Sequence, residues 1–420
     1  MNTQRLIFLS AHDPRDITKQ SGLPYSLFQA LTDHSADNPF SVRITWIGGG
    51  LRLLDLAARV VNKAFRKIGF PINCCYSTPY AMIAGCYLTI RFLFVRNGPV
   101  LAIAASNYLP YVITKRNVIY ISDATFHAIC NLYPVFKSLP KWLKAQGHRN
   151  EMKALAKTQF ALYPSQWASK SAHLDYGIPI DRIYQLPFGP SIPDNMIKRY
   201  YSTKSIASVQ EIVVIFVSTD WTRKNGDKAI NVCRLLIEAG LRTRLILVGL
   251  VPEYARHLDF VDYRGFLHKS DPAHLTELCQ AYRESHFLLS PTTAEAFGIV
   301  FSEAHAFGVP PVAYDVGGTG SAIVPDITGL LLPLGASPEM FAKKILQYVH
   351  DPELYGELSL RCREQYLQRA NWRQWSALIF QLSRQPLQHV PLTTSLTDLG
   401  TAEQSSEPDA AGNAAYGRRV

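Results

Sequence analysis

The sequence lacks the signals that mark secreted and membrane-spanning chains. Its seven cysteines are odd in number and scattered, no two form a C-x-x-C pair, and Cys74 and Cys75 are too close to bridge easily, so we expect reduced thiols. The apolar run near the start is too short for a signal peptide, and the run at 80–95 is interrupted by Arg91 and falls short of a bilayer-spanning helix. These absences predict a cytoplasmic protein without a transmembrane anchor.

Metal-ligand patterns and internal repeats are also missing. The chain has no D-x-D carboxylate pair in a plausible binding loop, no cluster of His and Cys ligands, and no repeat of fixed period. We therefore expect neither a divalent metal nor a bound cofactor.

What the chain does have is length and apolar content. With 420 residues and 47% hydrophobic residues it is too long for one core and suits two α/β domains. Runs of Val, Ile and Leu alternate with helical stretches in both halves, which predicts parallel, doubly wound sheets. Residues 187–205 combine prolines, a glycine and polar residues without a clear period, so we place the domain boundary there.

The most informative stretch is 291–320, PTTAEAFGIVFSEAHAFGVPPVAYDVGGTG, which carries two glutamates, Glu295 and Glu303. Its pattern predicts a loop after the short apolar strand 287–290, then a helix over 298–307. The first amides of such a helix have no partners within it and lie at the positive end of its dipole, so Gly298, Ile299 and Val300 are candidates to bind a phosphate. Phe297 precedes them. The carboxylate of Glu303, on a mostly apolar helix, suits hydroxyls of a group attached to that phosphate.

A second strand-to-helix turn carries two cations. The apolar run 212–217 predicts a buried parallel strand, and STDWTRKNGDKAI follows it as a polar turn that opens a helix. Arg223 and Lys224 stand in this turn, where a planar guanidinium and a point charge can together neutralise a diphosphate. Asn225 follows them and can adopt a left-handed conformation.

The segment from Glu295 to Glu303, followed by GVPPVAYDVGG and PDITGLLL, resembles the signature of family 4 retaining glycosyltransferases. The resemblance implies an α/β chain with the GT-B fold, in which two doubly wound Rossmann-like domains face a central cleft. The implied domains are an acceptor-binding domain at 1–190, a nucleotide-sugar-binding domain at 206–370 and a helix at 371–385 that crosses back to the first domain. From Pro386 onwards the chain is rich in Thr, Ser, Gln, Ala and Gly with little to bury, which predicts a disordered tail at 386–420.

The resemblance also implies roles for single residues. It places Glu295 near the donor sugar, makes Glu303 a ligand of the ribose hydroxyls, and makes Lys224 a cation that holds the donor diphosphate. The family commonly has an arginine six residues before this lysine, where this chain has Ser218, so Arg223 is the candidate substitute.

In the N-terminal half, the loop containing Ser21 and Gly22 follows a predicted first strand and resembles the glycine loop that approaches donor and acceptor. The segment VIYISD, ending at Asp123, resembles the one whose polar strand-end residue points at the sugar. Many members of the family have histidine there. This chain has Asp123, which we take as a candidate catalytic residue with Glu295 and Lys224, while Thr125 and His127 lie close by as alternatives. A surface histidine is an equally good interpretation of His127.

The implied reaction is sugar transfer from a nucleotide-diphosphate sugar to a glycan, lipid-linked or small-molecule acceptor, with retention of anomeric configuration. Two alternatives stay open. The first is another GT-B enzyme, a phosphorylase or a nucleotide-sugar epimerase, although we find no pyridoxal phosphate lysine signature. The second is a protein that binds nucleotide sugars without catalysis.

The net charge of +10 calls for a partner. In segment 51–70 the basic residues Arg52, Arg59, Lys63, Arg66 and Lys67 fall within an arc of roughly 100° of a helix, with apolar residues opposite. Such a helix can lie on an anionic membrane, which would put the protein at the inner membrane face near a lipid-linked acceptor. The alternative is a surface helix whose apolar face packs on the core. No nucleic-acid recognition motif accompanies the basic residues, and we expect no nucleic-acid partner.

Overall fold

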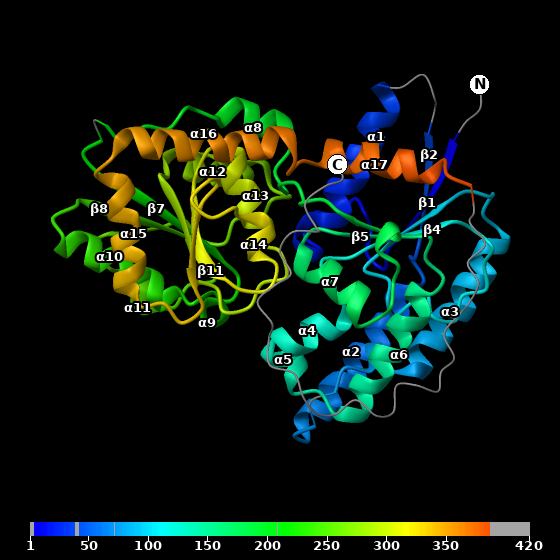
Figure 1. The fold of residues 1–420 in the computed structure, drawn as a ribbon. Helices are drawn as coiled ribbons and strands as arrows, with labels where there is room; N and C mark the ends of the chain where they lie inside the picture. Colours follow the sequence, from blue (N-terminus) through cyan, green and yellow to red (C-terminus); the bar gives the residue numbers. More distant parts are fainter. Residues whose placement is uncertain (1–3, 38–41, 71, 208, 387–420) are drawn as a thin grey trace. The chain divides into compact units, whose positions relative to one another are not determined.

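The computed structural model describes residues 4–37, 42–70, 72–207 and 209–386, which contain two parallel sheets of six strands each (Figure 1). We call the first sheet with its helices the first lobe and the second sheet with its helices the second lobe. Both sheets lie within one compact unit. The prediction of an α/β chain with two parallel sheets is confirmed.

The first sheet has the strand order β2-β1-β3-β4-β5-β6, and all its pairs are parallel. Its strands are β1 (Gln4–Leu9), β2 (Val42–Ile47), β3 (Val100–Ile103), β4 (Val118–Ile121), β5 (Phe160–Tyr163) and β6 (Ile183–Gln185). The lobe's helices are α1 (Leu23–Asp37), α2 (Leu51–Lys67), α3 (Thr78–Leu93), α4 (Phe126–Leu132), α5 (Pro134–Lys137), α6 (Lys141–Leu155) and α7 (Gln166–Leu174), with 3-10 turns at η1 (Gln20–Gly22), η2 (Cys74–Tyr76) and η3 (Ile180–Arg182).

The second sheet has the strand order β12-β11-β10-β7-β8-β9 and is also wholly parallel. Its strands are β7 (Ile212–Ser218), β8 (Thr243–Gly249), β9 (Val261–Tyr263), β10 (Phe287–Ser290), β11 (Pro311–Asp315) and β12 (Leu330–Pro333). Its helices are α9 (Trp221–Lys224), α10 (Gly226–Glu238), α11 (Glu253–Arg256), α12 (Pro272–Glu284), α13 (Ile299–Ala306), α14 (Thr319–Ala322), α15 (Pro338–Val349) and α16 (Pro352–Gln368).

Helices cover both faces of each sheet because successive strand residues point to opposite sides. In β1, Leu6 and Phe8 pack in one core with Leu27 of α1, whereas Ile7 and Leu9 pack in another core with residues of α2 and α3. In β7 the same alternation divides the strand between a core that includes α12 and α13 and a core that includes α10 and α15. Burial on both faces explains why these strands are continuous apolar runs.

The C-terminal helix α17 (Trp372–Ser383) packs along α1 of the first lobe (Figure 1). The indole of Trp375 donates a hydrogen bond to the carbonyl of Pro187 at 2.9 Å, and that of Trp372 donates to Pro190 at 2.7 Å. Both rings lie against Phe188, whose centroid is 5.5 Å from Trp372 and 5.1 Å from Trp375. Phe188 in turn packs against Phe297 of the second lobe. These four rings form the aromatic junction of the molecule.

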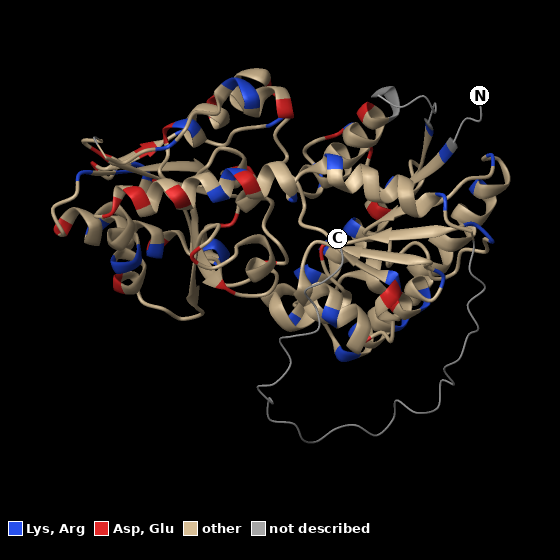
Figure 2. Ribbon diagram, turned by 45° about the horizontal axis from the view of Figure 1, so that its top comes forward, with Lys and Arg blue, Asp and Glu red and all other residues tan. Residues whose placement is uncertain are grey.

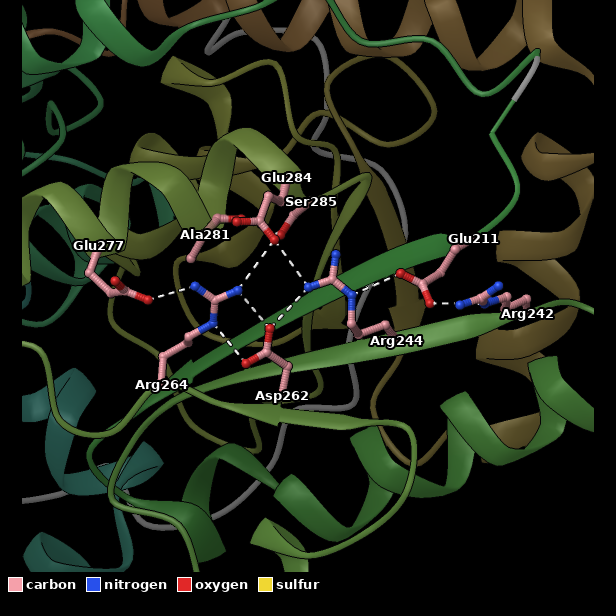
Figure 3. Close-up of polar contacts among 9 residues, drawn as sticks. All are labelled: Glu211, Arg242, Arg244, Asp262, Arg264, Glu277, Ala281, Glu284 and Ser285. Carbon is pink, nitrogen blue, oxygen red and sulfur yellow. Dashed lines mark hydrogen bonds and ion pairs between the residues drawn. The ribbon is translucent and has the colours of Figure 1, made fainter.

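A network of charged side chains ties β8, β9 and α12 together (Figure 3). Arg244 contacts Glu211, Asp262 and Glu284 at 2.8–3.0 Å, and Arg264 contacts Asp262, Glu277 and Glu284. These contacts raise the pKa of both guanidinium groups and lower the pKa of Asp262.

The segment 187–205, which shows no clear period, contains the short helix α8 (Asp194–Tyr200), which buries Ile197 alone and so leaves little apolar pattern. The domain division at 1–190, 206–370 and 371–385 stays a prediction. The expected tail at 386–420 lies, apart from residue 386, outside the described residues.

The alternative in which the apolar face of segment 51–70 packs on the core is wrong for most of that face. Helix α2 buries Leu51, Asp55 and Ala58, while Leu53 is 74% exposed and Val60 63% exposed. The reason is geometric, because the helix contacts the rest of the lobe along a narrow strip around Leu51 and Ala58.

Candidate functional site

A cavity of about 280 Å³ opens where the carboxyl ends of strands from both sheets meet. The first lobe contributes the loop before α1 and the ends of β3 and β4, and the second lobe contributes Arg223 and the loop before α13. The lining residues are Gln20, Ser21, Leu23, Ile103, Ala104, Ile121, Ser122, Asp123, Tyr133, Phe188, Arg223, Glu295, Ala296, Phe297, Gly298 and Ile299. The carboxyl edge of parallel strands is where α/β proteins bind their ligands.

Two cations and one carboxylate meet at the second lobe's side of this cavity. The Lys224 ammonium forms a short hydrogen-bonded ion pair with Glu295, and Nη1 of Arg223 lies 3.4 Å from the same carboxylate oxygen. Nη1 of Arg223 also donates to the carbonyl of Ala294 at 2.7 Å, and its Nε lies 3.2 Å from Asp220. Lys224 and Glu295 are both buried. One carboxylate is therefore the shared internal counter-ion of both cations.

The local backbone explains how the two cations reach the site. Asp220 caps the short helix α9 by accepting from the amide of Arg223 at 3.1 Å. Asn225 then adopts the left-handed conformation, with φ 58°, before α10 begins, as its side-chain type allows.

The N-terminus of α13 faces the same cavity. Gly298 is the N-cap residue with φ 86°, and Gly298 and Ile299 both line the cavity. The opening amides of a helix are unpaired within it and favour an anion. Val300, the third residue expected here, follows in the first turn of α13 but does not line the cavity.

Glu303 lies on α13 with its side chain only 2% exposed and already holds three partners. Its carboxylate pairs with Lys269 through a short contact, accepts from the hydroxyl of Tyr282 at 3.1 Å, and lies 3.3 Å from the backbone amide of Ser191. Glu303 does not line the cavity in this arrangement. A diol that binds Glu303 has to share it with Lys269.

From the first lobe, Ser21 and Asp123 line the cavity, whereas Gly22 lies behind Ser21 against the side chain of Ser191. Asp123 is exposed to the cavity, yet protein surrounds it closely, and this desolvation, with the nearby Glu295 carboxylate, raises the pKa of Asp123. Thr125 is fully buried and caps α4 at the amide of Ala128.

His127 lies apart from the cavity. Its ring contacts Asn131 at 2.8 Å and lies 3.8 Å from Asp175, beside a separate hollow between α4 and α7. Of the three neighbouring polar residues considered from the sequence, Asp123 is the one that reaches the cavity.

Sequence reasoning missed several residues that position the site. The hydroxyl of Tyr133 accepts from the amide of Ala296 at 2.8 Å, and its ring lies 5.8 Å from the Arg223 guanidinium carbon. Gly318 donates from its amide to the carbonyl of Glu295 at 3.0 Å. A Cβ at Gly318 would stand 1.8 Å from the carbonyl oxygen of Ala296, so the glycine allows two loops to approach. In the sequence, the GGTG run at 317–320 is the pattern that could have indicated this close approach of two loops.

Residues in strained backbone conformations gather around the cavity. Gln20, Ser21, Ala104 and Asn225 have positive φ angles of 45–58°, and Gly22 follows with φ 81°. Among the described residues, Asp326 is the one other non-glycine residue with such an angle. Such conformations cost of order 1–3 kcal/mol each and cluster at functional sites.

No cluster of three or more His, Cys, Asp or Glu side chains suited to a metal ion occurs within the described ranges. In the same part of the chain, no helix has both the length and the apolar character needed to cross a bilayer.

Comparison with known sequences identifies relatives of part of the chain. Residues 200–365 match the family model described as glycosyl transferases group 1. A protein named D-inositol 3-phosphate glycosyltransferase from Rhodococcus erythropolis is 33% identical over 162 residues, which are 36% of this chain and 36% of that protein. The match thus spans about a third of the length of such curated relatives.

Solved structures resemble nearly the whole chain. Sucrose-phosphate synthase from Thermosynechococcus elongatus has a TM-score of 0.59 at 15% identity and covers 91% of this chain and 98% of its own. HepE of Anabaena, solved in complex with UDP and glucose, has a TM-score of 0.58 at 15% identity and covers 90% of this chain and 98% of its own. At these identities the likeness shows the fold, and the expected GT-B architecture is confirmed.

Proposed function

We propose that this chain, whose residues 200–365 match the glycosyl transferases group 1 family, is a retaining, hexosyltransferase-type enzyme that moves a sugar from a nucleotide-diphosphate donor to an acceptor hydroxyl. The observation that carries the proposal is the convergence of Arg223, Lys224 and Glu295 beside the N-terminus of α13, with Asp123 lining the same cavity from the other lobe.

In this proposal the second lobe binds the donor. The diphosphate lies between Arg223, Lys224 and the amides of Gly298 and Ile299, which stabilise the negative charge that grows on the departing phosphate. Glu295 then exchanges its cation contacts for hydroxyls of the sugar, and Glu303 accepts hydroxyls of the ribose in competition with Lys269. Ser21 and Phe297 flank the donor from opposite lobes, and Gly22 and Val300 support the loops that carry them.

The transfer needs no protein acid. The bond between the anomeric carbon and the phosphate oxygen breaks, the acceptor oxygen bonds to the same face of that carbon, and the acceptor proton passes to the departing phosphate oxygen. Asp123, with its raised pKa, faces the sugar as a hydrogen-bonding group. The protein's part is to position the reactants and exclude water. No metal is part of this mechanism.

The acceptor is assigned to the first lobe in this proposal. The first lobe lies largely outside the family match, so the name of the Rhodococcus relative supports no particular acceptor here. We propose a glycan or lipid-linked acceptor bound by the first lobe, and a cytoplasmic protein that works at the inner membrane face.

A thermal-shift panel of UDP-, GDP- and ADP-sugars tests donor binding. UDP-sugars come first because HepE, of the same fold, was solved with UDP and glucose. The donor that binds should raise the melting temperature of the wild type. Glu303→Ala should lose most of that rise, whereas Glu357→Ala, an exposed glutamate on α16, should keep it.

Product analysis then separates the proposed reaction from its alternatives. A new glycoside with the donor's anomeric configuration supports transfer, whereas a sugar phosphate would indicate a phosphorylase and an isomerised donor an epimerase. Tight donor binding with neither transfer nor slow donor hydrolysis would leave a binding protein. Unchanged donor affinity in Glu303→Ala would refute the ribose role.

A further inference from the structure

Helix α3 is mostly apolar, with Arg91 as its one charged residue, and one apolar side of it is exposed. Its buried side consists of Ala81, Ala84, Gly85, Leu88 and Phe92. The opposite side spans roughly 120° at 100° per residue, and it consists of Met82, Ile83, Cys86, Ile90 and Leu93, with Phe94 directly after the helix. Leu93 and Phe94 are each 78% exposed and Ile90 is 57% exposed. A helix with so few polar residues is typical of a core or a membrane, and this one lies at a surface.

Helix α2, which contacts α3, divides into three faces. Leu51, Asp55 and Ala58 form the buried face. Next to it lies the basic arc of Arg52, Arg59, Lys63, Arg66 and Lys67, all exposed. The third face, next to the basic arc, is apolar and also exposed, and it carries Leu53, Ala57, Val60, Val61, Ala64 and Ile68. An exposed apolar strip flanked by cations is the pattern of a helix that lies in a lipid interface.

Charge separates this region from the rest of the chain. Between residues 38 and 122 the sequence has ten Lys and Arg and one acidic residue, Asp55, so the segment supplies nearly all of the net charge of +10. Asp55 itself is buried and accepts a hydrogen bond from the hydroxyl of Tyr80. Arg52 pairs with Asp13 at 3.5 Å, whereas Arg59, Lys63, Arg66 and Lys67 form no ion pair among the described residues. Figure 2 shows Lys and Arg positions in blue and Asp and Glu positions in red.

From these three observations we infer that the exposed faces of α2 and α3 form a docking surface for a lipid bilayer rich in anionic headgroups. We name it the lipid-docking surface and define it by the exposed apolar and basic residues of 52–68 and 82–96. The apolar side chains enter the acyl boundary, and the Arg and Lys side chains reach the headgroups. A second copy of the chain is a poorer occupant because two such basic surfaces repel each other.

The lipid-docking surface also has a consequence for the acceptor. Helix α2 starts directly after β2, at the same carboxyl edge of the first sheet from which Ser21, Ala104 and Asp123 line the cavity. The first turn of α2, with Arg52 and Leu53, therefore places one end of the lipid-docking surface at that edge. This extends the proposed function to an acceptor whose reacting hydroxyl is attached to a membrane lipid.

Vesicle sedimentation of the full chain, without donor, tests the docking itself. The wild type should sediment with phosphatidylcholine vesicles that contain phosphatidylglycerol and stay in solution with phosphatidylcholine alone. Ile90→Glu combined with Leu93→Glu should weaken binding by more than roughly tenfold. The matched control is Leu360→Glu with Leu367→Glu on α16, where both leucines are similarly exposed at 56% and 57%, and it should bind as the wild type does.

A second variant tests how much the basic residues contribute to vesicle binding. Arg59→Gln, Lys63→Gln and Arg66→Gln together should weaken binding to anionic vesicles by roughly 100-fold, and added salt should weaken the wild type in the same direction. An environment-sensitive dye on the exposed thiol of Cys86 should shift to shorter wavelength when anionic vesicles are added, because this site would enter the apolar boundary.

Several outcomes would overturn the inference. These are absence of vesicle binding by a folded wild type, equal binding by the α3 variant and its α16 control, or a wild-type dimer that the α3 variant turns into monomers. Circular dichroism confirms that each variant is folded. Because sedimentation needs no donor and the donor panel needs no lipid, failure of docking and failure of the proposed transfer are read separately.

Discussion

At the scale of single residues, Glu295 is a central group of the site because its carboxylate pairs with both Lys224 and Arg223, while Asp220 also pairs with Arg223. A donor diphosphate must take over these cations, so it competes with Glu295 for them. The Glu295 side chain thus weakens binding of the diphosphate, although it binds the hydroxyls of the donor sugar.

We predict that Glu295→Gln binds the free nucleoside diphosphate roughly fivefold to tenfold more tightly than the wild type, because the competing charge is gone. Sugar transfer should fall by roughly 100-fold or more, because the amide cannot replace the carboxylate at the sugar. Isothermal titration and steady-state rates measure the two effects. Weaker diphosphate binding with transfer intact would contradict the proposed exchange.

Glu151 gives a prediction on pH. This fully buried carboxyl accepts from the amide of Phe126 at the start of α4, and burial raises its pKa from 4.5 to about 7. The folded protein keeps this proton up to about pH 7, whereas the unfolded chain releases it near 4.5. The contribution of Glu151 to the free energy of unfolding therefore falls by ~3 kcal/mol as pH rises through that window.

Glu151→Gln mimics the protonated carboxyl, so the free energy of unfolding of this variant should lack the fall with rising pH that Glu151 causes. Chemical denaturation at intervals from pH 5 to about 8 compares the two proteins, and the variant should be the more stable one at the upper end. Parallel curves for variant and wild type would show that the carboxyl titrates as an ordinary exposed one.

At the scale of elements, the charged network of Figure 3 joins two strands to α12, and its arginines differ in exposure and in how many carboxylates they contact. Arg244 is 28% exposed and meets three carboxylates, whereas Arg242 is 73% exposed and meets Glu211 alone. Arg244→Met should lower the free energy of unfolding by about 1–2 kcal/mol, since it leaves half-buried carboxylates with fewer partners. Arg242→Met should change it by less than about 0.5 kcal/mol. Urea denaturation measures both, and equal losses would contradict a network centred on Arg244.

The loop pair around Glu295 gives another element-scale prediction. Gly318→Ala places a Cβ against the carbonyl of Ala296 and should displace the Glu295 loop, lowering both the melting temperature and donor affinity. Gly356→Ala in α16 is the control, because its Cβ meets no atom within 4 Å and a helical alanine stabilises by about 0.5–1 kcal/mol. Normal donor binding by Gly318→Ala would show that the contact does not position the site.

The sequence predicts elements well where one pattern dominates. The strand at 287–290, a helix within 298–307 and the left-handed Asn225 are confirmed, with Gly298 and Phe307 as the caps of the helix Ile299–Ala306, because apolar runs, a glycine and an Asn act locally. The ion pair between Lys269 and Glu303 and the support from Tyr133 could not be predicted, since both join segments far apart in the chain and no spacing rule connects them. The exposure of the apolar face of α2 depended likewise on how its neighbours pack.

At the scale of the whole molecule, the aromatic junction of Phe188, Phe297, Trp372 and Trp375 links α17 to the connection between the lobes and to the cavity. Trp375→Ala should lower the free energy of unfolding by about 3–5 kcal/mol and split thermal unfolding into two transitions, because α17 would lose its anchor at Pro187. The control is Trp142→Ala, a half-exposed tryptophan on α6, which should leave one transition. Calorimetry distinguishes these results, and a single transition in Trp375→Ala would contradict the junction's role.

The positive net charge of residues 38–122 also determines how the protein adsorbs to a negatively charged solid surface. Because the remainder of the chain is close to neutral, a cation-exchange resin or a mica sheet should hold the molecule through its first lobe. Immobilised in that way, every copy would point in the same direction, and force or fluorescence measurements on such a layer would sample one orientation.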